Sequence, residues 1–487
     1  MRIKKKELIE MVEQLIDVNT QFDKSGEMPQ GVDPAECQEL AVKLGNFIEE
    51  KYKNSNIENI IRSLEEYCEL LYQTTLPYNK DQVKLHKIIK KMRMTLLNAE
   101  HGIEYDLPKD RKQVVFLPYK ASMWDSLESI WMEAHKDPEI DDFVIPIPYF
   151  DRNPDGSFAA MHYEGDLYPD YVPITDWQKY SIPDEKPDVI FIHNPYDDCN
   201  YVTSVHPAFY SRELKKWTEC LVYVPYFVLD GNFVSPEFAV NPANINADFI
   251  ICQNADEKRS YIKELSKAEP KVDFRKKILP LGSPKFDKII NLSENIVKIP
   301  GIWKKRICEQ KPKKIIFYNS SVGALLRQDI TFYIQKIADI FNDCCKANIL
   351  VIWRPHPLIE ATLRSMRIEY YNIYMKFKTA FINENMGILD ENEDMYPAIF
   401  LSDVYMGDFS SVLSLYIATG KPMIASEENT DNLYYFVGSN FKFSANDTED
   451  FLKENIHKEM LDWVPAYKLC DFGSGKRIYE QIIANSK

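Results

Sequence analysis

The sequence predicts an α/β protein whose parallel sheets are covered by helices, with a helical extension at the N-terminus. From residue 113 onward, short apolar runs alternate with segments of helical periodicity, which is typical of doubly wound parallel sheets. Small and polar residues directly follow several of these runs. In a parallel sheet such residues gather at the carboxyl ends of the strands, where ligands bind.

The first part of the chain has apolar residues at intervals of three and four, which indicates amphipathic helices. We expect four helices, at residues 6–18, 33–52, 55–73 and 81–99. Asp33 followed by Pro34 is a good helix start, with Asp as the N-cap and Pro in the first turn. We interpret these helices as an antiparallel hairpin or bundle, and two roles remain open for it: dimerisation and contact with a membrane surface.

The next part of the chain is predicted to form a first parallel sheet. Its five apolar runs are residues 113–118, 143–148, 189–192, 221–226 and 249–252. The loop after the first run carries Lys120, Ser122 and Trp124, and Tyr149 follows the second run. We take these four residues as candidate ligand contacts, with simple packing as the alternative for Trp124. No Gly-x-Gly-x-x-Gly and no P-loop string follows any run, so neither nucleotide fingerprint is present.

Residues 151–188 form a long connection that is rich in Tyr, Asp and Pro. Long loops in compact domains are usually functional or mobile. We expect this loop to overhang the binding cleft, where its aromatic and acidic residues would suit hydroxyl groups. His162 within it is a weak candidate, because a satisfied structural histidine is the commoner case.

Further strands are predicted from runs at 277–281, 314–318, 349–353, 398–401, 403–406 and 423–425. The third run leads into Arg354 and His356, which flanking prolines hold in extended backbone. Arg is the preferred fork for phosphate oxygens, and His donates to phosphate or moves a proton near neutral pH. A histidine that caps a loop is the structural alternative.

Asp408, Ser410 and Ser411 lie between a strand-like run and a helical run at 412–419. Unpaired N–H groups and the positive end of the dipole make the first turn of a helix an anion site, and hydroxyls add donors. Ordinary N-capping is the simpler explanation when such residues stand alone. Further strand-end residues of this kind are Gly282, Ser283, Asn319 and Ser320. Their recurrence favours a shared ligand site.

The order of these motifs resembles the C-terminal half of the CDP-glycerol glycerophosphotransferases, the teichoic-acid primases and polymerases of Gram-positive bacteria. The similar stretches are Leu281-Gly282-Ser283-Pro284-Lys285-Phe286-Asp287, Tyr318-Asn319-Ser320, Arg354-Pro355-His356-Pro357, Asp394-Met395-Tyr396, Asp408-Phe409-Ser410-Ser411 and Lys421-Pro422. They resemble the family's Gly-x-Pro-x-x-Asp turn and its Arg-x-His-Pro, Thr-Asp-Tyr-Ser-Ser and Lys-Pro strings.

The resemblance implies a GT-B fold, in which two Rossmann-type domains face each other across a cleft and the second binds the nucleotide. The expected parts are a helical extension at 1–108, an acceptor domain at 109–292, a donor domain at 293–470 and a C-terminal helix at 471–487 that crosses back. The implied donor-binding set is Gly282, Ser283, Asn319, Ser320, Arg354, His356, Asp408, Ser410, Ser411 and Glu427. The acceptor-side set is Lys120, Ser122, Trp124 and Tyr149.

The chain departs from the family at the general base. A His-Gly pair follows the fourth strand in family members, whereas this chain has Pro225-Tyr226 there. His193, His206 and Asp230 lie near neighbouring strand ends and are the replacement candidates, and His356 completes the catalytic set. His193 is preferred because it follows a strong apolar strand and precedes an Asn-Pro turn signal.

Composition narrows the function classes. The 487 residues have a net charge of -15, which argues against nucleic-acid binding. Nine cysteines without a Cys-x-x-Cys pair indicate reduced thiols, and metal-ligand spacing is missing. We find no signal peptide and no apolar run of about 18 residues. The expected location is cytoplasmic, at the inner face of the cell membrane if the basic patches 2–6 and 271–277 touch it.

Together these features predict a metal-independent transferase without a cofactor. It would move glycerol phosphate, or a related polyol phosphate, from a CDP-linked donor to an acceptor hydroxyl in cell-wall or surface polymer synthesis, releasing CMP. The expected partners are the nucleotide-diphosphate donor and a polymer, lipid-linked or glycan acceptor. Two alternatives stay open: a nucleotide-sugar glycosyltransferase of the same fold, and a catalytically silent nucleotide-binding homologue. Self-association through residues 1–108 also stays open.

Overall fold

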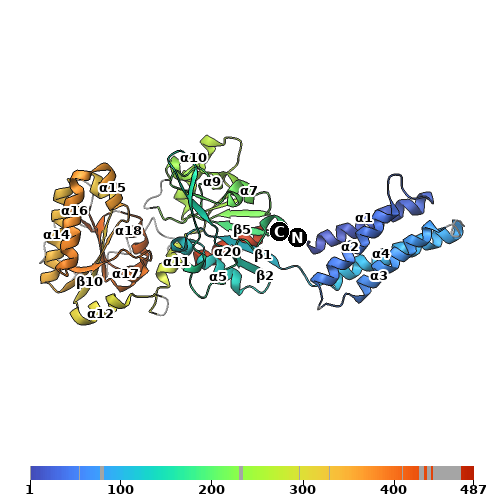
Figure 1. The fold of residues 1–487 in the computed structure, drawn as a ribbon, viewed down its shortest axis with the longest axis horizontal. Helices are drawn as coiled ribbons and strands as arrows, with labels where there is room; N and C mark the ends of the chain where they lie inside the picture. The colour runs from blue at the N-terminus through green and yellow to red at the C-terminus, as the bar shows by residue number, and fades with distance from the viewer. Residues whose placement is uncertain are drawn as a thin grey trace. The chain divides into compact units, whose positions relative to one another are not determined.

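The computed structural model describes residues 2–53, 55–76, 82–229, 234–294, 297–327, 329–408, 410–426, 433–435, 440–441 and 473–486. The chain forms two compact units, Met1–Lys112 and Gln113–Lys487 (Figure 1). Of the sequence-based candidates, Asp230 and Glu427 lie outside the described residues.

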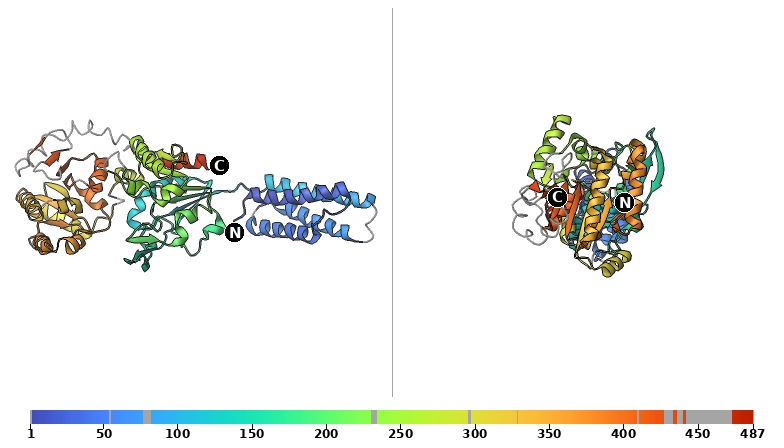
Figure 2. Two further views of the ribbon diagram at one scale, coloured as in Figure 1. Left: turned by 90° about the horizontal axis from the view of Figure 1, so that it is seen from above. Right: turned by 90° about the vertical axis from the view of Figure 1, so that its left-hand side faces the viewer.

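The first unit is a bundle of four helices, and all four expected helices are present (Figure 2). They are α1 (Lys5–Ser25), α2 (Pro34–Lys51), α3 (Glu58–Thr75) and α4 (Gln82–Tyr105). Asp33 caps α2 by accepting a hydrogen bond from the Ala35 N–H at 2.9 Å. The helix α1 runs past its predicted end at Val18 and stops at Gly26, whose φ of +71° a helix cannot continue.

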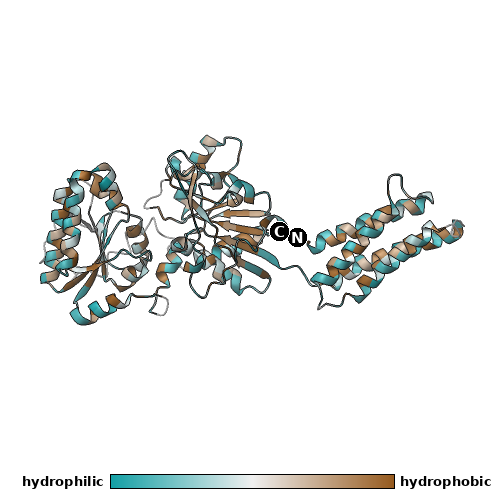
Figure 3. Cartoon of the chain, in the orientation of Figure 1, coloured by the Kyte–Doolittle hydropathy of each residue, from teal (hydrophilic) through white to brown (hydrophobic). Residues whose placement is uncertain are grey.

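Figure 3 shows apolar residues recurring along these helices, and the buried ones form the core of the bundle. Members that are at most 1% exposed include Leu8, Val12, Leu15, Leu44, Ile48, Ile60, Leu71, Leu96 and Ile103. Their spacings of three, four, seven or eleven residues keep them on one face of each helix, which is the pattern that predicted the bundle. Among the described residues, no helix has the length and apolar content needed to cross a membrane.

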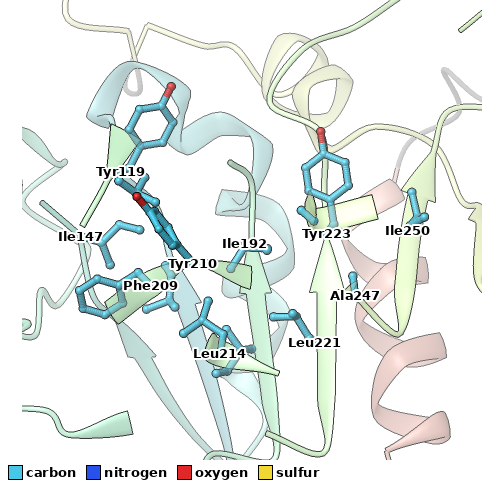
Figure 4. Close-up of a cluster of buried hydrophobic side chains, with 14 of the residues drawn as sticks. Tyr119, Ile147, Ile192, Phe209, Tyr210, Leu214, Leu221, Tyr223, Ala247 and Ile250 are labelled. Atoms are coloured by element: carbon cyan, nitrogen blue, oxygen red, sulfur yellow. The ribbon is translucent and has the colours of Figure 1, made fainter. Parts of the chain in front are cut away.

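The second unit contains two sheets that are largely parallel, which confirms the α/β fold class. The first has the order β2-β1-β5-β7-β8-β9. Its strands are β1 (Lys112–Leu117), β2 (Ile140–Val144), β5 (Val189–Ile192), β7 (Cys220–Tyr223), β8 (Phe249–Cys252) and β9 (Ile278–Pro280). Alternate residues of β1 enter two different cores: Val115 and Leu117 join one, and Val114 and Phe116 join the other. Figure 4 shows part of the first of these cores.

The helices of this first α/β part are mostly short. They are η2 (Ala121–Ser126), α5 (Glu128–Lys136), η3 (Gly165–Leu167), α6 (Ile182–Glu185), η4 (Pro207–Phe209), α7 (Ser211–Leu214), α8 (Pro236–Ala239), α9 (Pro242–Asn246), α10 (Ala255–Ala268) and α11 (Pro284–Ile290). Of these, α5 packs beside β2 and α10 beside β9.

The second sheet has the order β12-β11-β10-β13-β14-β15-β16. Its strands are β10 (Lys314–Ser320), β11 (Ile349–Pro355), β12 (Gly387–Leu389), β13 (Val404–Asp408), β14 (Met423–Ser426), β15 (Leu433–Tyr435) and β16 (Asn440–Phe441). The pairs from β12 to β14 are parallel, and β15 and β16 add antiparallel pairs. Here too β10 alternates between two cores, because Ile316 and Tyr318 pack into one and Phe317 into the other.

Helices cover both faces of the second sheet (Figure 1). They are α12 (Gly301–Gln310), α13 (Val322–Arg327), α14 (Ile330–Lys346), α15 (Ile359–Met366), α16 (Ile368–Asn383), α17 (Tyr396–Leu401), α18 (Ser411–Tyr416) and η5 (Ile417–Thr419). Residues of α14 and α16 pack into the core that contains Tyr318, whereas residues of α17 and α18 pack into the core that contains Phe317.

The last described helix, α20 (Ser474–Asn485), packs on the first sheet. Its Ile478 and Ile482 are fully buried in the same core as Val114 and Phe116. Asp287, at the end of the Gly-x-Pro-x-x-Asp-like turn, accepts hydrogen bonds from the backbone N–H groups of residues 473, 474 and 475. One carboxylate therefore satisfies the amino end of a helix that is distant in sequence.

Three sequence-based expectations about local structure are wrong. The run at 398–401 belongs to helix α17, because Pro397 occupies its first turn and Asp394 accepts from the Tyr396 N–H. The strand expected at 143–148 is β2 at 140–144, since prolines at 146 and 148 remove ladder donors. The long loop contains strands: β3 (Tyr149–Arg152) and β4 (Phe158–His162) form an antiparallel sheet with β6 (Thr203–Val205).

Candidate functional site

Asn319 joins three neighbouring strand ends of the second sheet. It pairs with Arg354 on β11 and with Gly407 on β13. Its Nδ2 donates to the Arg354 carbonyl at 3.0 Å, and its Oδ1 accepts from the Ser410 hydroxyl at 2.9 Å. Gly407 has a φ of +142°, and a Cβ there would lie 2.1 Å from the Asn319 carbonyl oxygen. Glycine therefore permits a close approach of β10 and β13 that a larger residue would block.

Asp408 is a buried carboxylate at the end of β13. Its Oδ2 accepts from the Ser321 N–H and from the Tyr333 hydroxyl, both at 2.6 Å. Its own carbonyl accepts from the Tyr405 hydroxyl at 2.7 Å. Burial, and next the Asp408 charge, raise the pKa of Tyr333, so this phenol stays protonated and donates. The carboxylate thus fixes the loop after β10, one strand away from the serine loop that we expected it to orient.

Ser410 and Ser411 begin helix α18. Ser410 is the N-cap, and its hydroxyl accepts from the Leu413 N–H at 3.4 Å while donating to Asn319. Ser411, the first helical residue, is exposed. The N–H groups of Ser411 and Val412 belong to the first turn, where an α-helix supplies no carbonyl partner. This turn can therefore offer both amide and hydroxyl donors to an anion.

Arg354 is turned toward a carboxylate. Its Nη1 is 2.7 Å from Oδ2 of Asp390, which is fully buried, and its Nη2 donates to the Glu393 carbonyl at 3.3 Å. The Arg354 guanidinium, which we predicted to bind phosphate, is thus already bonded to protein oxygens. In this arrangement the guanidinium stabilises the loop that follows β12.

His356 is exposed just beyond the end of β11. Its backbone N–H donates to the Ser320 carbonyl at 2.9 Å, and its Nδ1 accepts from the Leu358 N–H at 3.1 Å. In the neutral ring the proton is therefore on Nε2, which can donate to a ligand. Partial desolvation, and next the Arg354 charge, lower the pKa of His356, so the neutral ring prevails at pH 7.

The structure brings seven predicted donor-binding residues to one edge of the second sheet. They are Asn319, Ser320, Arg354, His356, Asp408, Ser410 and Ser411, and we call them the strand-end cluster. Arg354 and Gly407 flank Asn319 on opposite sides, so the two outer backbones are two strand spacings, or about 10 Å, apart. That span is suited to a diphosphate with its attached groups.

Gly282 and Ser283 do not belong to this cluster. They follow β9 in the first sheet, and the Gly282 N–H donates to the Cys252 carbonyl at 3.2 Å. A Cβ on Gly282 would lie 2.4 Å from the Ser474 hydroxyl, so the turn is shaped to receive helix α20. The expected donor contact of these two residues stays a prediction, and in this structure the motif positions the C-terminal helix.

His193 is fully buried, and both of its ring nitrogens are hydrogen-bonded. Nε2 accepts from the Tyr119 N–H at 3.0 Å, and Nδ1 lies 3.0 Å from the Ser126 hydroxyl. Burial, and next the charge of Lys285, lower the pKa of His193 to about 3, so the ring is neutral. The first-ranked base is a structural histidine in this arrangement, because no nitrogen remains to take a proton from a substrate.

His206 is partly exposed and rests among the rings of Phe150, Trp177 and Phe209. Its Nδ1 accepts from the Ala208 N–H at 3.3 Å. Desolvation lowers the pKa of His206 as well. Its environment is aromatic packing beside the small antiparallel sheet, and it caps the short helix η4.

The acceptor-side residues separate into two groups. The Lys120 ammonium lies over the rings of Tyr119 and Tyr149, and the Tyr149 hydroxyl donates to Glu164 at 2.7 Å. Ser122 is exposed, whereas Trp124 is buried against Trp131 and Tyr168, so packing accounts for it. No sequence pattern marks Glu164, which also accepts from the Ala121 N–H and so ties the long connection to the first loop.

Asp125 links the two α/β parts of the second unit. Its Oδ2 accepts from the Lys285 ammonium at 2.5 Å and from the Tyr396 hydroxyl. Lys285 and Tyr396 lie within two of the family-like motifs, but a single sequence could not show that both converge on one carboxylate. Among the described residues, no group of three or more His, Cys, Asp or Glu is placed to hold a metal ion.

Residues 258–436 match the family model of the CDP-Glycerol:Poly(glycerophosphate) glycerophosphotransferases. This match confirms the resemblance drawn from the motifs and the class of a glycerophosphotransferase-like transferase. The matched residues include the whole strand-end cluster. No curated protein sequence matches the chain.

Solved structures offer distant likenesses. S. aureus MnaA in a co-structure with UDP has a TM-score of 0.44 at 10% identity, covering 77% of this chain and 98% of its own. The UDP-GlcNAc 2-epimerase from Methanocaldococcus jannaschii has a TM-score of 0.46 at 13% identity, covering 77% and 99%. A variant of the wall teichoic acid polymerase TagF has a TM-score of 0.44 at 13% identity, covering 88% and 98%. At this distance they assign no role to any residue.

Proposed function

We propose that this protein transfers glycerol phosphate, or a related polyol phosphate, from a CDP-linked donor to an acceptor hydroxyl during synthesis of a cell-wall or surface polymer. The observation that carries the proposal is the family match at residues 258–436, which contains the strand-end cluster. A parallel sheet binds ligands at this edge, so the matched segment and the polar cluster support the same assignment.

The donor diphosphate rests on the first turn of α18 in this proposal. The hydroxyl of Ser411 and the first-turn amides donate to phosphate oxygens, and Asn319 holds Ser410 in place through a bond of 2.9 Å. His356 donates from Nε2 to the oxygen that becomes the leaving group. Arg354 acts indirectly, because Asp390 already engages its guanidinium at 2.7 Å.

The reaction proceeds by attack of the acceptor oxygen on the β-phosphorus. A bond from that oxygen to the β-phosphorus forms, and the bond to the bridging oxygen breaks, so CMP leaves with the bridging oxygen. Donors aimed at the bridging oxygen neutralise the charge that develops on CMP, which is where such groups accelerate transfer most. The acceptor hydroxyl loses its proton to a general base in the same step.

The test is an incubation of the full chain with CDP-glycerol, with and without a glycerol-phosphate oligomer as acceptor. We expect CMP to appear, faster when the acceptor is present, and the oligomer to grow by glycerol-phosphate units. Parallel incubations with UDP-sugars should release no UDP. Release of UDP without release of CMP would contradict the proposal and favour the glycosyltransferase alternative.

One observation favours a second candidate, a catalytically silent nucleotide-binding protein. The place of the family's His-Gly is taken by Pro225-Tyr226, and both nitrogens of His193 are occupied. Thermal denaturation with CDP-glycerol separates the two functions, since a bound ligand raises the apparent stability by mass action. Stabilisation by CDP-glycerol without any CMP release, across several acceptors, would establish the silent protein.

A further inference from the structure

Two helices of the bundle, α2 and α3, pack side by side and leave a groove between them on the surface (Figure 1). We call it the α2–α3 groove. Its volume is about 420 Å³, and its lining residues fall on one face of each helix, from 38 to 49 on α2 and from 61 to 72 on α3. Eleven helical residues span about 16 Å. The floor is apolar and includes Ala41, Val42, Gly45, Ile61, Leu64 and Tyr72.

Two features of the floor mark it as a binding surface. Val42 and Tyr72 are 51% and 53% exposed, and apolar side chains that gather in a hollow are typical of interaction sites. Gly45 lies in the middle of α2, where glycine is less favourable than alanine. A Cβ on Gly45 would lie 3.9 Å from the Cδ1 atoms of Ile61 and Leu64, so packing against α3 does not require glycine. The glycine leaves space in the floor for a side chain from another molecule.

The rim of the groove is acidic. Glu49, Glu65 and Glu69 line it and are exposed, and none of the described residues that line it is basic. Opposite charge across an interface favours the correct partner and disfavours others. The groove therefore suits an apolar ridge of about its own length with positive charges beside it.

Helix α4 of the same bundle carries such a ridge on its exposed side. The ridge, which we call the α4 stripe, has members at intervals of three and four residues: Lys87, Lys90, Met94, Leu97, His101 and Tyr105. Met94 and Leu97 are 57% and 37% exposed, and the two lysines precede them on the same face. From Lys87 to Leu97 the stripe is about 15 Å long, close to the length of the groove.

The α4 stripe cannot enter the groove of its own chain. The buried residues of α4, among them Met92, Leu96 and Ile103, lie on the opposite side of the helix and pack into the bundle core. The stripe therefore points away from the bundle. A groove can receive it only from a second copy of the chain.

We infer that the bundles of two copies of this chain bind each other, with the α4 stripe of one copy in the α2–α3 groove of the other. Met94 and Leu97 cover the apolar floor beside Gly45, and Lys87 and Lys90 lie near the carboxylates of the rim. Because the two surfaces differ, the contact is heterologous, and it repeats from copy to copy into a ring or an open chain. An anionic membrane would use the stripe alone and leave the acidic groove without a role.

The test measures the mass of the full chain by sedimentation velocity over a hundredfold range of concentration. We expect the weight-average mass of the wild type to rise with concentration. Gly45→Leu should weaken the association at least tenfold, because the leucine fills the floor, and leucine also favours the helix. Lys43→Leu is the matched control: the Lys43 side chain is 73% exposed on α2, outside the groove, and this variant should associate as the wild type does.

A second pair of variants tests the charges of the α4 stripe. Lys87→Glu with Lys90→Glu should weaken the association at least tenfold, since like charges would then meet at the rim. Lys6→Glu with Lys43→Glu makes the same charge change on exposed lysines of α1 and α2 and should not. Raising the salt concentration from about 0.05 M to about 0.5 M should weaken the wild-type association, because salt screens exposed charges.

A mixture of two variants tests the heterologous contact directly. Gly45→Leu keeps an intact stripe, whereas Lys87→Glu with Lys90→Glu keeps an intact groove. At concentrations at which the wild type associates, each variant alone should have the mass of one chain. The equimolar mixture should form a dimer and nothing larger, because one stripe and one groove remain in each pair.

Three results would overturn the inference: a wild type that stays monomeric throughout, association of Gly45→Leu or of the Lys87 and Lys90 double variant as strong as that of the wild type, or a mixture that forms no dimer. Binding of a monomeric wild type to phosphatidylglycerol vesicles through Lys87 and Lys90 would also overturn it, and would assign the α4 stripe to a membrane surface. The result does not depend on the proposed function.

Discussion

The carboxyl ends of the two sheets carry similar polar residues but leave them in different states. At the first sheet, His193 is fully buried between the Tyr119 N–H and the Ser126 hydroxyl. At the second sheet, His356 and Ser411 are exposed. A histidine after a buried apolar strand is thus a structural residue in one sheet and an available donor in the other.

The difference comes from the loops at the two sheet edges. The loop and helix η2 after β1 lie over the end of β5 and supply both partners of His193. After β11, the His356 side chain stays exposed, and its Nδ1 accepts from the Leu358 N–H. Position at a strand end therefore predicts where a side chain lies, and the neighbouring loop decides whether its polar atoms are free.

The largest effect is expected for His193→Ala. The change removes two buried hydrogen bonds and leaves a cavity, so the free energy of unfolding should fall by about 3 kcal/mol at pH 7. Urea unfolding followed by tryptophan fluorescence measures it for the second unit, because every Trp lies after residue 112. A loss below about 1 kcal/mol would mean that this histidine is as free as His356.

The same histidine makes stability depend on pH. Its folded pKa of about 3 lies below the ordinary value of 6.5, so the unfolded chain binds the proton first as the pH falls. Stability from this group is complete above pH 6.5 and is lost toward pH 3, with about 2 kcal/mol lost by pH 5. His193→Ala should lack that part of the pH dependence.

His356→Ala tests the other side of the comparison. Because the ring is exposed, the free energy of unfolding should change by less than about 0.5 kcal/mol. Turnover of CDP-glycerol should fall about 100-fold, the usual range for loss of a proton donor. His135→Ala, another exposed histidine, is the control. If His356→Ala leaves both donor binding and product formation unchanged, the proposed mechanism is wrong.

Glu257→Gln tests whether polar groups near the carboxyl end of the first sheet are buried away from water. Glu257 is 1% exposed, its Oε2 accepts from the Gln253 N–H, and burial raises its pKa to about 7. The folded state keeps its proton between pH 4.5 and 7 while the unfolded state loses it, so stability falls as pH rises through that window. The variant should gain roughly 2–3 kcal/mol over wild type at pH 8 and little at pH 4.5, measured by urea unfolding.

The smallest effect is expected for Ser411→Ala. Loss of one hydroxyl donor should weaken CDP-glycerol binding about fivefold, near 1 kcal/mol, without loss of stability. Ser122→Ala, an exposed serine after the first strand of the other sheet, is the matched control and should leave donor affinity unchanged. If the two changes weakened CDP-glycerol binding equally, the donor site could not be assigned to the edge of the second sheet.

Local patterns predicted most elements of the fold but could not locate partners that are distant in the chain. The alternation of Val114 to Leu117 between two cores is visible as a continuous apolar run, which is how β1 was predicted. The engagement of Arg354 by Asp390 was not predictable, because nothing near the arginine marks its partner. The prediction of a strand at 398–401 failed because a short apolar segment fits a helix and a strand equally well.

The strand-end cluster could be predicted because its members share one edge of a parallel sheet. The contacts of Asp125 with Lys285 and Tyr396 could not be predicted, because these two residues lie 160 and 271 positions further along the sequence. Gly282 was placed with the ligand by its motif, whereas its neighbour in space is Ser474. Resemblance transfers the order of motifs more reliably than the contacts of each residue.

The packing of α20 into the core of the first sheet has a consequence for biosynthesis. The backbone N–H groups that bond to Asp287 are translated 186 or more residues after it. Until residues 474–485 are translated, the core that holds Val114 and Phe116 lacks Ile478 and Ile482 and is covered only in part, by residues of η2, α5 and the connection at 168–174. A nascent chain stalled before that point would expose apolar side chains of this core, so this part of the first sheet is completed only after residues 474–485 have been translated.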